Sequence, residues 1–193
     1  MMTIRKATVN DTEILADLLL LAMEDIVYRF IGQKNPEKAR AFMLHFVERK
    51  NNQYSFQNCW IAEKDGMVLG AANIYNGGHL HSLRKPVLDY VRSHYNANFY
   101  PEDETKEGEY YLDTLGVHPN HQGKGIGTRL LQFLVDEYVN RQGQTLGLLV
   151  DEENPSAKRL YVRLGFESAG VKVLLGKKLE HLQFKSGGGA KAL

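Results

Sequence analysis

The spacing of apolar residues along the chain predicts alternating helices and strands. After Asn10, and again after Pro36, apolar positions recur every three or four residues, which predicts two helices early in the chain. Two short apolar runs, 59–63 and 67–75, flank the turn signal Lys-Asp-Gly at 64–66. This arrangement predicts a β-hairpin.

The second half of the chain continues the alternation and predicts a layered α/β domain. A short strand at 3–7 comes before the helices, and the segment 77–108 interrupts the pattern with an expected helix over 86–94. The order of elements predicts one domain over residues 1–185, a mixed sheet with helices on both faces, followed by a flexible tail, 186–193. The remaining expected elements are a strand at 110–117, a helix at 128–141, a strand at 146–150, a helix at 155–164, and strands at 166–169 and 171–179.

Composition excludes several classes of protein. The chain has 193 residues, of which 43% are hydrophobic and 24% charged, and a net charge of +1. This balance is typical of a globular domain and gives no basic surface for nucleic acid. No apolar run reaches the length of a membrane span, residues 1–10 do not resemble a signal peptide, and Cys59 has no partner for an internal disulfide. We therefore expect a cytoplasmic protein that binds neither membrane nor nucleic acid.

Residues 122–127 read Gln-Gly-Lys-Gly-Ile-Gly and stand between an expected strand and an expected helix. The glycines remove Cβ atoms from the loop, so that several backbone N–H groups can converge on one anion. The helix that follows directs its positive end at the same point. No Lys-Ser or Lys-Thr follows, as a nucleotide P-loop requires, and Thr128 replaces the last glycine of the dinucleotide fingerprint. The loop predicts a different phosphorylated ligand.

This loop resembles the Q/R-x-x-G-x-G/A pyrophosphate loop of the GNAT (Gcn5-related) N-acetyltransferases, which bind acetyl-CoA. Residues 154–161, NPSAKRLY, with Gly-Phe at 165–166, are similar to a second motif of that family, N-x-x-A-x-x-L/F-Y followed by G-F. The resemblance covers residues 112–166 closely and 3–75 through the order of elements alone. It implies a mostly antiparallel central sheet and acetyl-CoA as the cosubstrate.

The resemblance also implies which residues bind acetyl-CoA. The backbone N–H of Leu115 would polarise the thioester carbonyl, and the loop amides would hold the pyrophosphate. Asn154 fits equally well as a helix N-cap, and Lys124 as a solvated loop residue. The full implied set is Leu115, Gly116, Val117, Gln122, Gly123, Lys124, Gly125, Ile126, Gly127, Thr128, Asn154 and Tyr161.

Acetyl transfer to an amine needs a proton acceptor, because an alkylamine with a pKa of about 10.4 is mostly protonated at neutral pH. Asp113 is the predicted base. It lies two residues before Leu115 on the same strand, so both side chains are expected on one face of the sheet, from which Asp113 can reach the acceptor side. The alternatives are Glu109, which has the same strand parity, water, or a group on another element. The resemblance implies that Tyr161 protonates the leaving thiolate; its other interpretation is a tyrosine that packs a helix on the sheet.

Together these features predict an N-acetyltransferase that moves the acetyl group of acetyl-CoA to an amine by direct attack in a ternary complex. A non-catalytic acyl-CoA-binding or sensing module of the same fold stays open, as does another phospho-ligand protein such as a nucleotide-binding regulator. We expect no metal site. The sequence does not decide between a small-molecule and a protein amine, nor whether the protein is a homodimer.

The insertion, residues 77–108, is expected to lie over the acceptor side of the cleft and to govern the choice of acceptor. Its length favours a functional role over a plain connection. Its aromatic side chains would form an apolar wall, and its carboxylates would attract a cationic amine. These residues are Tyr90, Tyr95, Phe99, Tyr100, Glu102, Asp103, Glu104 and Glu107. The other interpretation is a solvated acidic loop over a packed helix.

Overall fold

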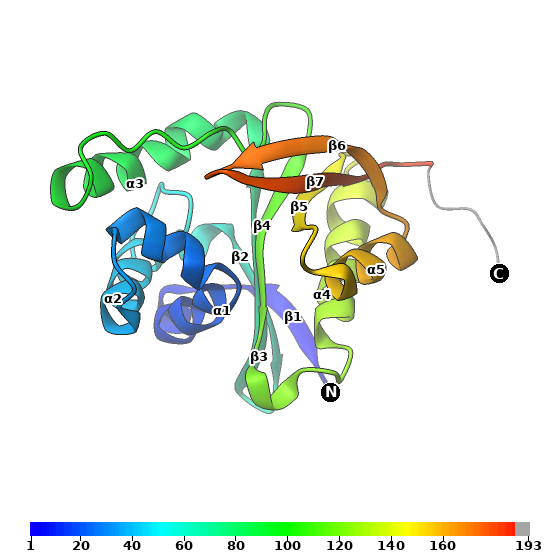
Figure 1. The fold of residues 1–193 in the computed structure, drawn as a ribbon. Coiled ribbons are helices and arrows are strands. Elements are labelled where there is room, and N and C mark those ends of the chain that lie inside the picture. Colours follow the sequence, from blue (N-terminus) through cyan, green and yellow to red (C-terminus); the bar gives the residue numbers. More distant parts are fainter. Residues whose placement is uncertain (188–193) are drawn as a thin grey trace.

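A seven-stranded sheet crosses the centre of the molecule in the computed structural model, which describes residues 1–187 (Figure 1). Its order is β1-β2-β3-β4-β5-β7-β6, and each pair of neighbours is antiparallel except β4 and β5, which are parallel. This confirms the predicted mixed, mostly antiparallel sheet. Residues 188–193 of the expected tail lie outside the described residues. The strands are β1 (Thr3–Lys6), β2 (Cys59–Lys64), β3 (Met67–Asn76), β4 (Tyr110–Val117), β5 (Leu146–Asp151), β6 (Glu167–Leu174) and β7 (Lys177–Phe184).

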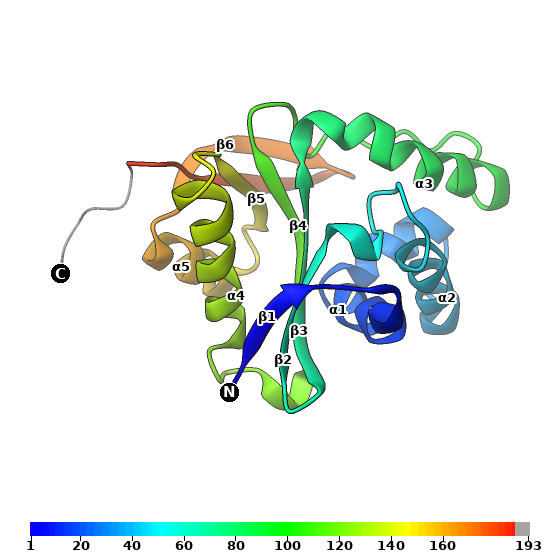
Figure 2. The ribbon, with the colours of Figure 1, turned by 180° about the vertical axis from the view of Figure 1, so that it is seen from behind.

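Helices cover both faces of the sheet (Figures 1 and 2). On one side lie α1 (Thr12–Ile31), α2 (Pro36–Val47) and α3 (Leu80–His94). On the other lie α4 (Ile126–Leu134), a π-helical continuation (Val135–Asn140), and α5 (Pro155–Leu164). Each face buries its own apolar cluster, one built largely from α1 and α2 and the other from α4 and β5. Within residues 1–187, no helix combines the length and the apolar character needed to cross a bilayer.

Local signals account for several helix and strand ends. The side chain of Asn35 accepts a hydrogen bond from the Lys38 N–H at 3.0 Å, and Pro36 follows as the first residue of α2. The turn between β2 and β3 places Asp65 and Gly66 at φ of 52° and 78°. Two left-handed residues in succession are typical of the type I′ turn of a tight hairpin, as predicted.

Helix α3 begins earlier than expected, at Leu80, and carries Pro86 in its interior. A proline there removes one backbone hydrogen bond, which is why the sequence pattern predicted that the helix starts at that residue. The helix nevertheless extends through Pro86, because Leu80, Val87 and Val91 are all buried against the rest of the molecule. Tertiary packing therefore outweighs the local cost of the proline.

The predicted boundary between the last two strands, at Gly170, is wrong. The turn of the β6–β7 hairpin lies at Leu175 and Gly176, with φ of 50° and 77°. Gly170, at φ 136°, instead makes a bulge inside β6, where the register with β7 shifts. Both places carry a turn-forming glycine, so the sequence pattern alone did not distinguish a bulge from a turn.

The longer hairpin brings its tip over to the opposite layer of the fold, towards α1 and α3 (Figure 1). The backbone N–H of Leu175 donates to the Glu102 carboxylate at 2.8 Å, and the Arg29 guanidinium donates to the Leu175 carbonyl. Three segments that are far apart in sequence are thereby joined around one region, which contains the candidate site.

Candidate active site

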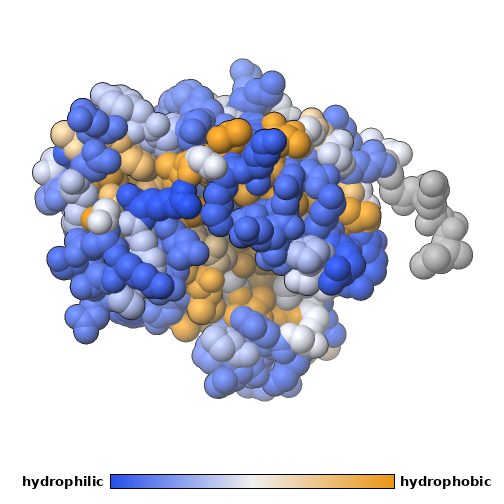
Figure 3. Space-filling model, viewed as in Figure 1, coloured by the Kyte–Doolittle hydropathy of each residue, from blue (hydrophilic) through white to orange (hydrophobic). Residues whose placement is uncertain are grey.

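Strands β4 and β5 pair at one end and then separate. Their parallel pairing extends from Tyr110 with Leu146 to Leu112 with Leu148 and stops there, although both strands continue. Beyond this point β4 has no sheet partner on that side, so its outward backbone groups need another one. Figure 3 shows apolar surface in a recess on this face of the molecule. An extended ligand could complete the sheet in the gap.

The direction of the β4 backbone follows from its pairing with β3. The N–H of His118 donates to the Leu69 carbonyl of β3 at 2.9 Å. Because hydrogen-bonding groups alternate along an antiparallel strand, the N–H groups of Leu115 and Val117 face away from β3 and into the gap. The carbonyl of Val117 accepts a hydrogen bond from the Gln122 side chain at 3.1 Å, which ties the glycine loop to the strand.

The glycine loop presents free backbone donors. Gly123 and Gly125 have φ of 73° and 78°, values that disfavour any other residue, and the space beside their Cα atoms is open. Within residues 1–187, the backbone N–H groups of 123–128 donate to no acceptor, and α4 begins among them, at Ile126. Unpaired donors at a helix N-terminus fit a pyrophosphate well. Lys124 bonds the Asn120 carbonyl at 2.9 Å, so it also stabilises the loop.

Helix α5 carries the other motif. Asn154 is its N-cap, since the side-chain oxygen accepts hydrogen bonds from the Ala157 N–H at 3.1 Å and the Ser156 hydroxyl at 3.0 Å. Tyr161 packs on Phe166, with ring centroids 5.8 Å apart. Its hydroxyl has no hydrogen-bond partner in the described part of the chain, and burial raises its pKa. Tyr161 is therefore held as the protonated phenol, the form that a general acid requires.

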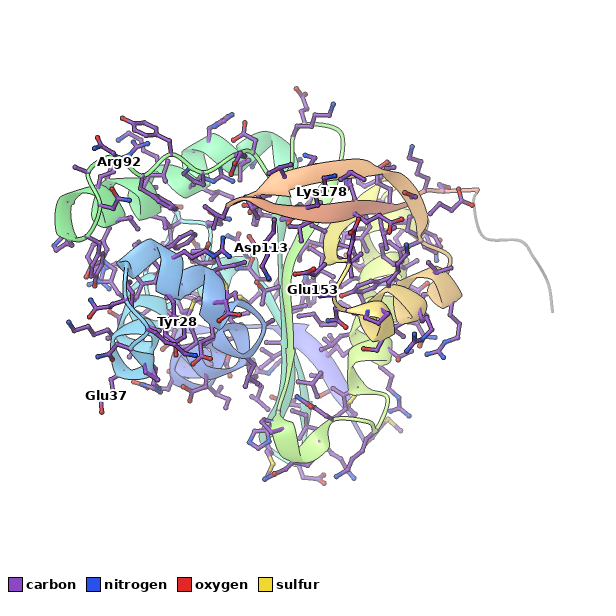
Figure 4. All side chains as sticks on the ribbon, in the orientation of Figure 1. Tyr28, Glu37, Arg92, Asp113, Glu153 and Lys178 are labelled. Atoms are coloured by element: carbon purple, nitrogen blue, oxygen red, sulfur yellow. The ribbon has the colours of Figure 1, made fainter. Side chains whose placement is uncertain are left out.

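Asp113 points to the opposite face of the sheet from Leu115, so the predicted shared parity is wrong. Asn73 of β3 pairs with Thr114 and Ile74 pairs with Leu112, which leaves Asp113 as the extra residue of a β-bulge. The bulge interrupts the alternation of side chains. Leu115 packs towards α4, whereas Asp113 lies in the centre of the molecule beside α1 and beneath the β6–β7 hairpin (Figure 4).

Asp113 shares its hydrogen-bond donors with Glu104, a carboxylate of the insertion. The Tyr75 hydroxyl lies 2.9 Å from Asp113 Oδ2 and 3.0 Å from Glu104 Oε1, and the Gln53 amide nitrogen contacts the same two oxygens. A phenol has only one proton to donate. With both carboxylates ionised, one of these oxygen–oxygen contacts would lack a hydrogen, so the arrangement is satisfied when the pair holds one proton.

The electrostatics of the pair agree with its geometry. Burial, followed by the charge of Asp113, raises the pKa of Glu104 to about 7, and burial likewise raises the pKa of Asp113. Arg84 opposes this effect: its guanidinium lies 3.1 Å from Glu104 Oε1 and 3.0 Å from Asp103 Oδ1. A singly protonated pair beside one arginine leaves little uncompensated charge in the buried region.

The carboxyl pair lines a narrow pocket with a volume of about 20 Å³, enough for a single water molecule. Apart from the pair, its walls are mainly apolar. The sheet separates this pocket from Tyr161, which contacts the apolar cluster on the α4 and α5 side. The gap between β4 and β5 therefore lies between a carboxyl pair on one face and a phenol on the other.

Two other groups that could take part in acetyl transfer, the Glu109 carboxylate and the Cys59 thiol, lie outside the pocket. Glu109 accepts hydrogen bonds from Thr105, His181 and Gln183 and does not line the pocket. Burial alone would raise the pKa of Glu109, but these hydrogen bonds outweigh it and lower the pKa. Burial raises the pKa of the Cys59 thiol to about 12, which leaves no thiolate for an acyl-cysteine route.

The insertion contributes fewer residues to the pocket than its composition suggested. Of the aromatic and acidic residues singled out, Phe99 and Glu104 line the pocket, whereas Tyr100 is 75% exposed. Gln53, Tyr75 and Arg84 were not among the predicted site residues. Only Arg84 left a readable signal, because it interrupts the apolar stripe of α3 and so marks a charge directed into the interior.

Comparison with known proteins assigns the chain to a family of acetyltransferases. The model of the acetyltransferase (GNAT) family matches residues 22–166. The chain is 41% identical over 64 residues to an N-alpha-acetyltransferase RimI of Mycobacterium tuberculosis, covering 33% of this chain and 39% of that protein. It is 38% identical over 74 residues to a mycothiol acetyltransferase of Kytococcus sedentarius, covering 38% of this chain and 24% of the relative. The matches thus span less than half of the length of these two curated relatives.

Solved structures share the fold over nearly the whole chain. An N-acetyltransferase from Staphylococcus aureus superposes with a TM-score of 0.82 at 21% identity, covering 94% of this chain and all of that one. A second acetyltransferase structure gives 0.77 at 28% identity and covers 95% of this chain and 98% of that one. A Salmonella typhimurium protein solved with its cofactor acetyl-CoA gives 0.56 at 20% identity, with coverage of 100% and 98%. At such low identity, the first and third show likeness of fold alone.

Proposed function

We propose, because the chain belongs to the acetyltransferase (GNAT) family, that it moves the acetyl group of acetyl-CoA to an amine acceptor by direct attack in a ternary complex. The observation that carries this proposal is the gap between β4 and β5. The phosphate-type loop lies at the open end of β4, and Asp113 and Tyr161 lie on opposite faces of the sheet beside the gap.

The chain's own backbone supplies most of the cofactor site in this proposal. The amides of 123–128 bind the pyrophosphate, and the outward backbone groups of Leu115 and Val117 bind the pantetheine arm as an added strand edge would. When bound, acetyl-CoA supplies an activated acyl carbon. The Leu115 N–H faces the gap and donates to the thioester oxygen, where negative charge develops during attack.

The proton acceptor and the proton donor lie on opposite faces of the sheet in this mechanism. Asp113, with Glu104 as its partner, accepts a proton from the ammonium form of the acceptor and frees the lone pair of the amine. As the new N–C bond forms and the C–S bond breaks, Tyr161 donates its proton to the sulfur. The second proton lost by the nitrogen returns to Tyr161 through solvent. A module that merely binds acyl-CoA would have no use for this buried carboxyl pair, so catalysis is the better proposal.

The cofactor site is tested with Gly125→Asp and a matched control, Gly143→Asp. Both glycines have positive φ, 78° and 67°, with open space beside them, but Gly143 lies after the π-helical turn and outside the loop. Calorimetry with acetyl-CoA should show at least a tenfold loss of affinity for Gly125→Asp, because a carboxylate replaces the phosphate in the loop, and no loss for the control. Equal affinities in both folded variants would refute the assignment.

A further inference from the structure

Arg84 is a buried cation of the insertion that bonds two different carboxylates. Its side chain is 7% exposed, with Nη1 3.0 Å from Asp103 Oδ1 and Nη2 3.1 Å from Glu104 Oε1. The Asp103 side chain is 51% exposed, whereas that of Glu104 is 10% exposed. The guanidinium therefore extends from the protein surface to the carboxyl pair, and the planar fork of an arginine holds both bonds in one orientation.

The helix that carries Arg84 also holds a second group at the pair. The backbone N–H of Gln53 donates to the Leu83 carbonyl of α3 at 2.9 Å. The side-chain amide of the same glutamine lies 2.8 Å from Asp113 Oδ2 and also contacts Glu104 Oε1. Helix α3 thus fixes two groups that contact the carboxyl pair, one as its own side chain and one through a backbone hydrogen bond.

Most groups around the pair are neutral. Three phenols, those of Tyr54, Tyr75 and Tyr111, face the two carboxyl groups from the segment before β2 and from the central strands. Burial raises the pKa of each phenol, so all three keep their protons. The α1 residues that line the pocket are apolar. None of these groups can compensate a negative charge on the pair.

The remaining charged groups act on the backbone or lie further out. Lys172 of β6 donates to the Glu104 carbonyl at 2.9 Å and so bonds the main chain. Asp103 and Glu102 face Arg84, and the His81 imidazole lies 3.3 Å from Asp103 Oδ2 at an exposed position. Within residues 1–187, Arg84 is therefore the one cation that bonds a carboxylate of the pair.

From these contacts we propose that Arg84 is the positioning residue of the carboxyl pair: it holds Glu104 against Asp113 and determines the pH range in which the pair accepts the proton of the amine. This inference rests on the proposed acetyl transfer and assigns the insertion a role in its proton chemistry. A cation beside a carboxylate stabilises the charged form, so Arg84 lowers the pKa of both carboxyl groups against the effect of burial. Without Arg84, the pair would keep its proton to higher pH.

The direct test follows this proton in the protein alone. Infrared difference spectroscopy records the carbonyl stretch of a protonated carboxyl group during a pH titration, and loss of the band in Glu104→Gln assigns it to the pair. In the wild type the band should disappear as the pH rises through about 7. In Arg84→Met it should persist about one to three pH units higher, the shift that an adjacent arginine produces on an aspartate. An unchanged midpoint in Arg84→Met overturns the inference.

Turnover gives a second measurement. Thiol release is followed across the pH range with whichever of spermidine, phenylalanine, 2-phenylethylamine and a short lysine peptide is acetylated fastest. Arg84→Met should lower kcat/KM by about tenfold or more below its midpoint, since each pKa unit is a factor of ten, and the loss should shrink at higher pH. Arg84→Lys keeps the charge and should restore most of the profile. Lys85→Met is the matched control, because Lys85 lies on the same helix, 72% exposed, and pairs with Asp89.

The outcomes separate this inference from the proposed function. If Arg84→Met does not fold, Arg84→Gln takes its place, because an amide can still donate to Glu104 but carries no charge. A loss of kcat/KM that is equal at every pH would assign Arg84 a structural role alone and overturn the inference. If the wild type acetylates none of the amines, the proposed function fails and the inference fails with it. If transfer occurs but neither the band nor the profile moves, acetyl transfer stands and the role of Arg84 is wrong.

Discussion

At the scale of single residues, the site depends on a proton that two carboxyl groups share. Tyr75 can donate to only one of the two oxygens that it contacts, so Asp113 and Glu104 behave as one titrating unit. Tyr54 and Tyr111 stay neutral beside them, because burial raises the pKa of each. Arg84 and Lys172, which bonds the Glu104 carbonyl at 2.9 Å, are the cations that face the pair.

The shared proton predicts a pH profile. A general base is active when deprotonated, so kcat/KM should rise with pH through about 7, the pKa of Glu104, and level off above it. In Glu104→Gln the rise in kcat/KM should occur at lower pH, because Asp113 no longer faces a second carboxylate. Glu107→Gln, at an exposed position of the same segment, is the control. Identical profiles for Glu104→Gln and the wild type would remove Glu104 from the proton transfer.

Tyr161 gives the second residue-scale prediction. Tyr161→Phe removes the phenolic proton and keeps the packing on Phe166, so kcat should fall by about 10²–10⁴-fold while acetyl-CoA affinity stays the same. Turnover is measured by thiol release and affinity by calorimetry. Tyr100→Phe, on the exposed side of the insertion, should match the wild type in both. An unchanged kcat would assign Tyr161 a packing role alone.

At the scale of elements, the contact between α1 and β4 positions the pocket. A Cβ atom on Gly116 would lie 1.9 Å from the Leu18 carbonyl oxygen of α1, so this close approach requires glycine. The same helix bends at Met23, where φ is −132°, and its last turns form one wall of the pocket. Gly116, expected as part of the cofactor strand, thus also determines how closely α1 approaches the sheet.

This contact predicts that Gly116→Ala destabilises the protein by about 1–3 kcal/mol, the usual cost of overpacking a tight core. The free energy of unfolding is measured in urea. The control is Gly127→Ala, where the new Cβ would meet Leu115 and Val117 at an ordinary 3.6 Å. It should be neutral or stabilising by up to about 1 kcal/mol, because alanine favours a helix over glycine. Equal stabilities for both variants would show that α1 can shift without cost.

At the scale of the whole molecule, the insertion is part of the core rather than a detachable lid. Its own residues Leu80, Val87 and Val91 are buried against the rest of the molecule, and the ring centroids of Phe99 and Phe30 are 5.1 Å apart. Replacing residues 78–107 by a short turn would therefore remove core packing along with Glu104. The role of the insertion in acceptor choice has to be tested through single side chains such as Phe99, which lines the pocket.

Binding of acetyl-CoA should also stabilise the whole molecule. At a ligand concentration of 100 times Kd, the gain is about 2.7 kcal/mol. For a chain of this length that corresponds to a rise in Tm of roughly 5–10 °C. ATP and NAD at the same concentration should give a much smaller rise, since the loop lacks their binding motifs. A larger shift with ATP or NAD would favour a nucleotide-binding protein instead.

The sequence by itself determined the features that short stretches of chain encode. The glycine loop, the Asn154 cap, the β2–β3 turn and the order of the elements all depend on neighbours within a few residues, where glycine, proline and apolar spacing act directly. These features were enough to predict the α/β fold and the family resemblance. The placement of a ligand in the loop and the roles of Tyr161 and Asp113 remain predictions.

Only the tertiary structure decided which side chains meet. Gln53 contacts Glu104 and Asp113 across 51 and 60 positions of sequence, and a bulge opposite β3 directs Asp113 to the face away from Leu115. No local pattern encodes such meetings, because they depend on strand register and on how closely helices approach the sheet. The hairpin tip at Leu175 likewise reaches the pocket only because β6 and β7 pair along their full length. The length of that pairing depends on packing and does not follow from the spacing of residues in the sequence.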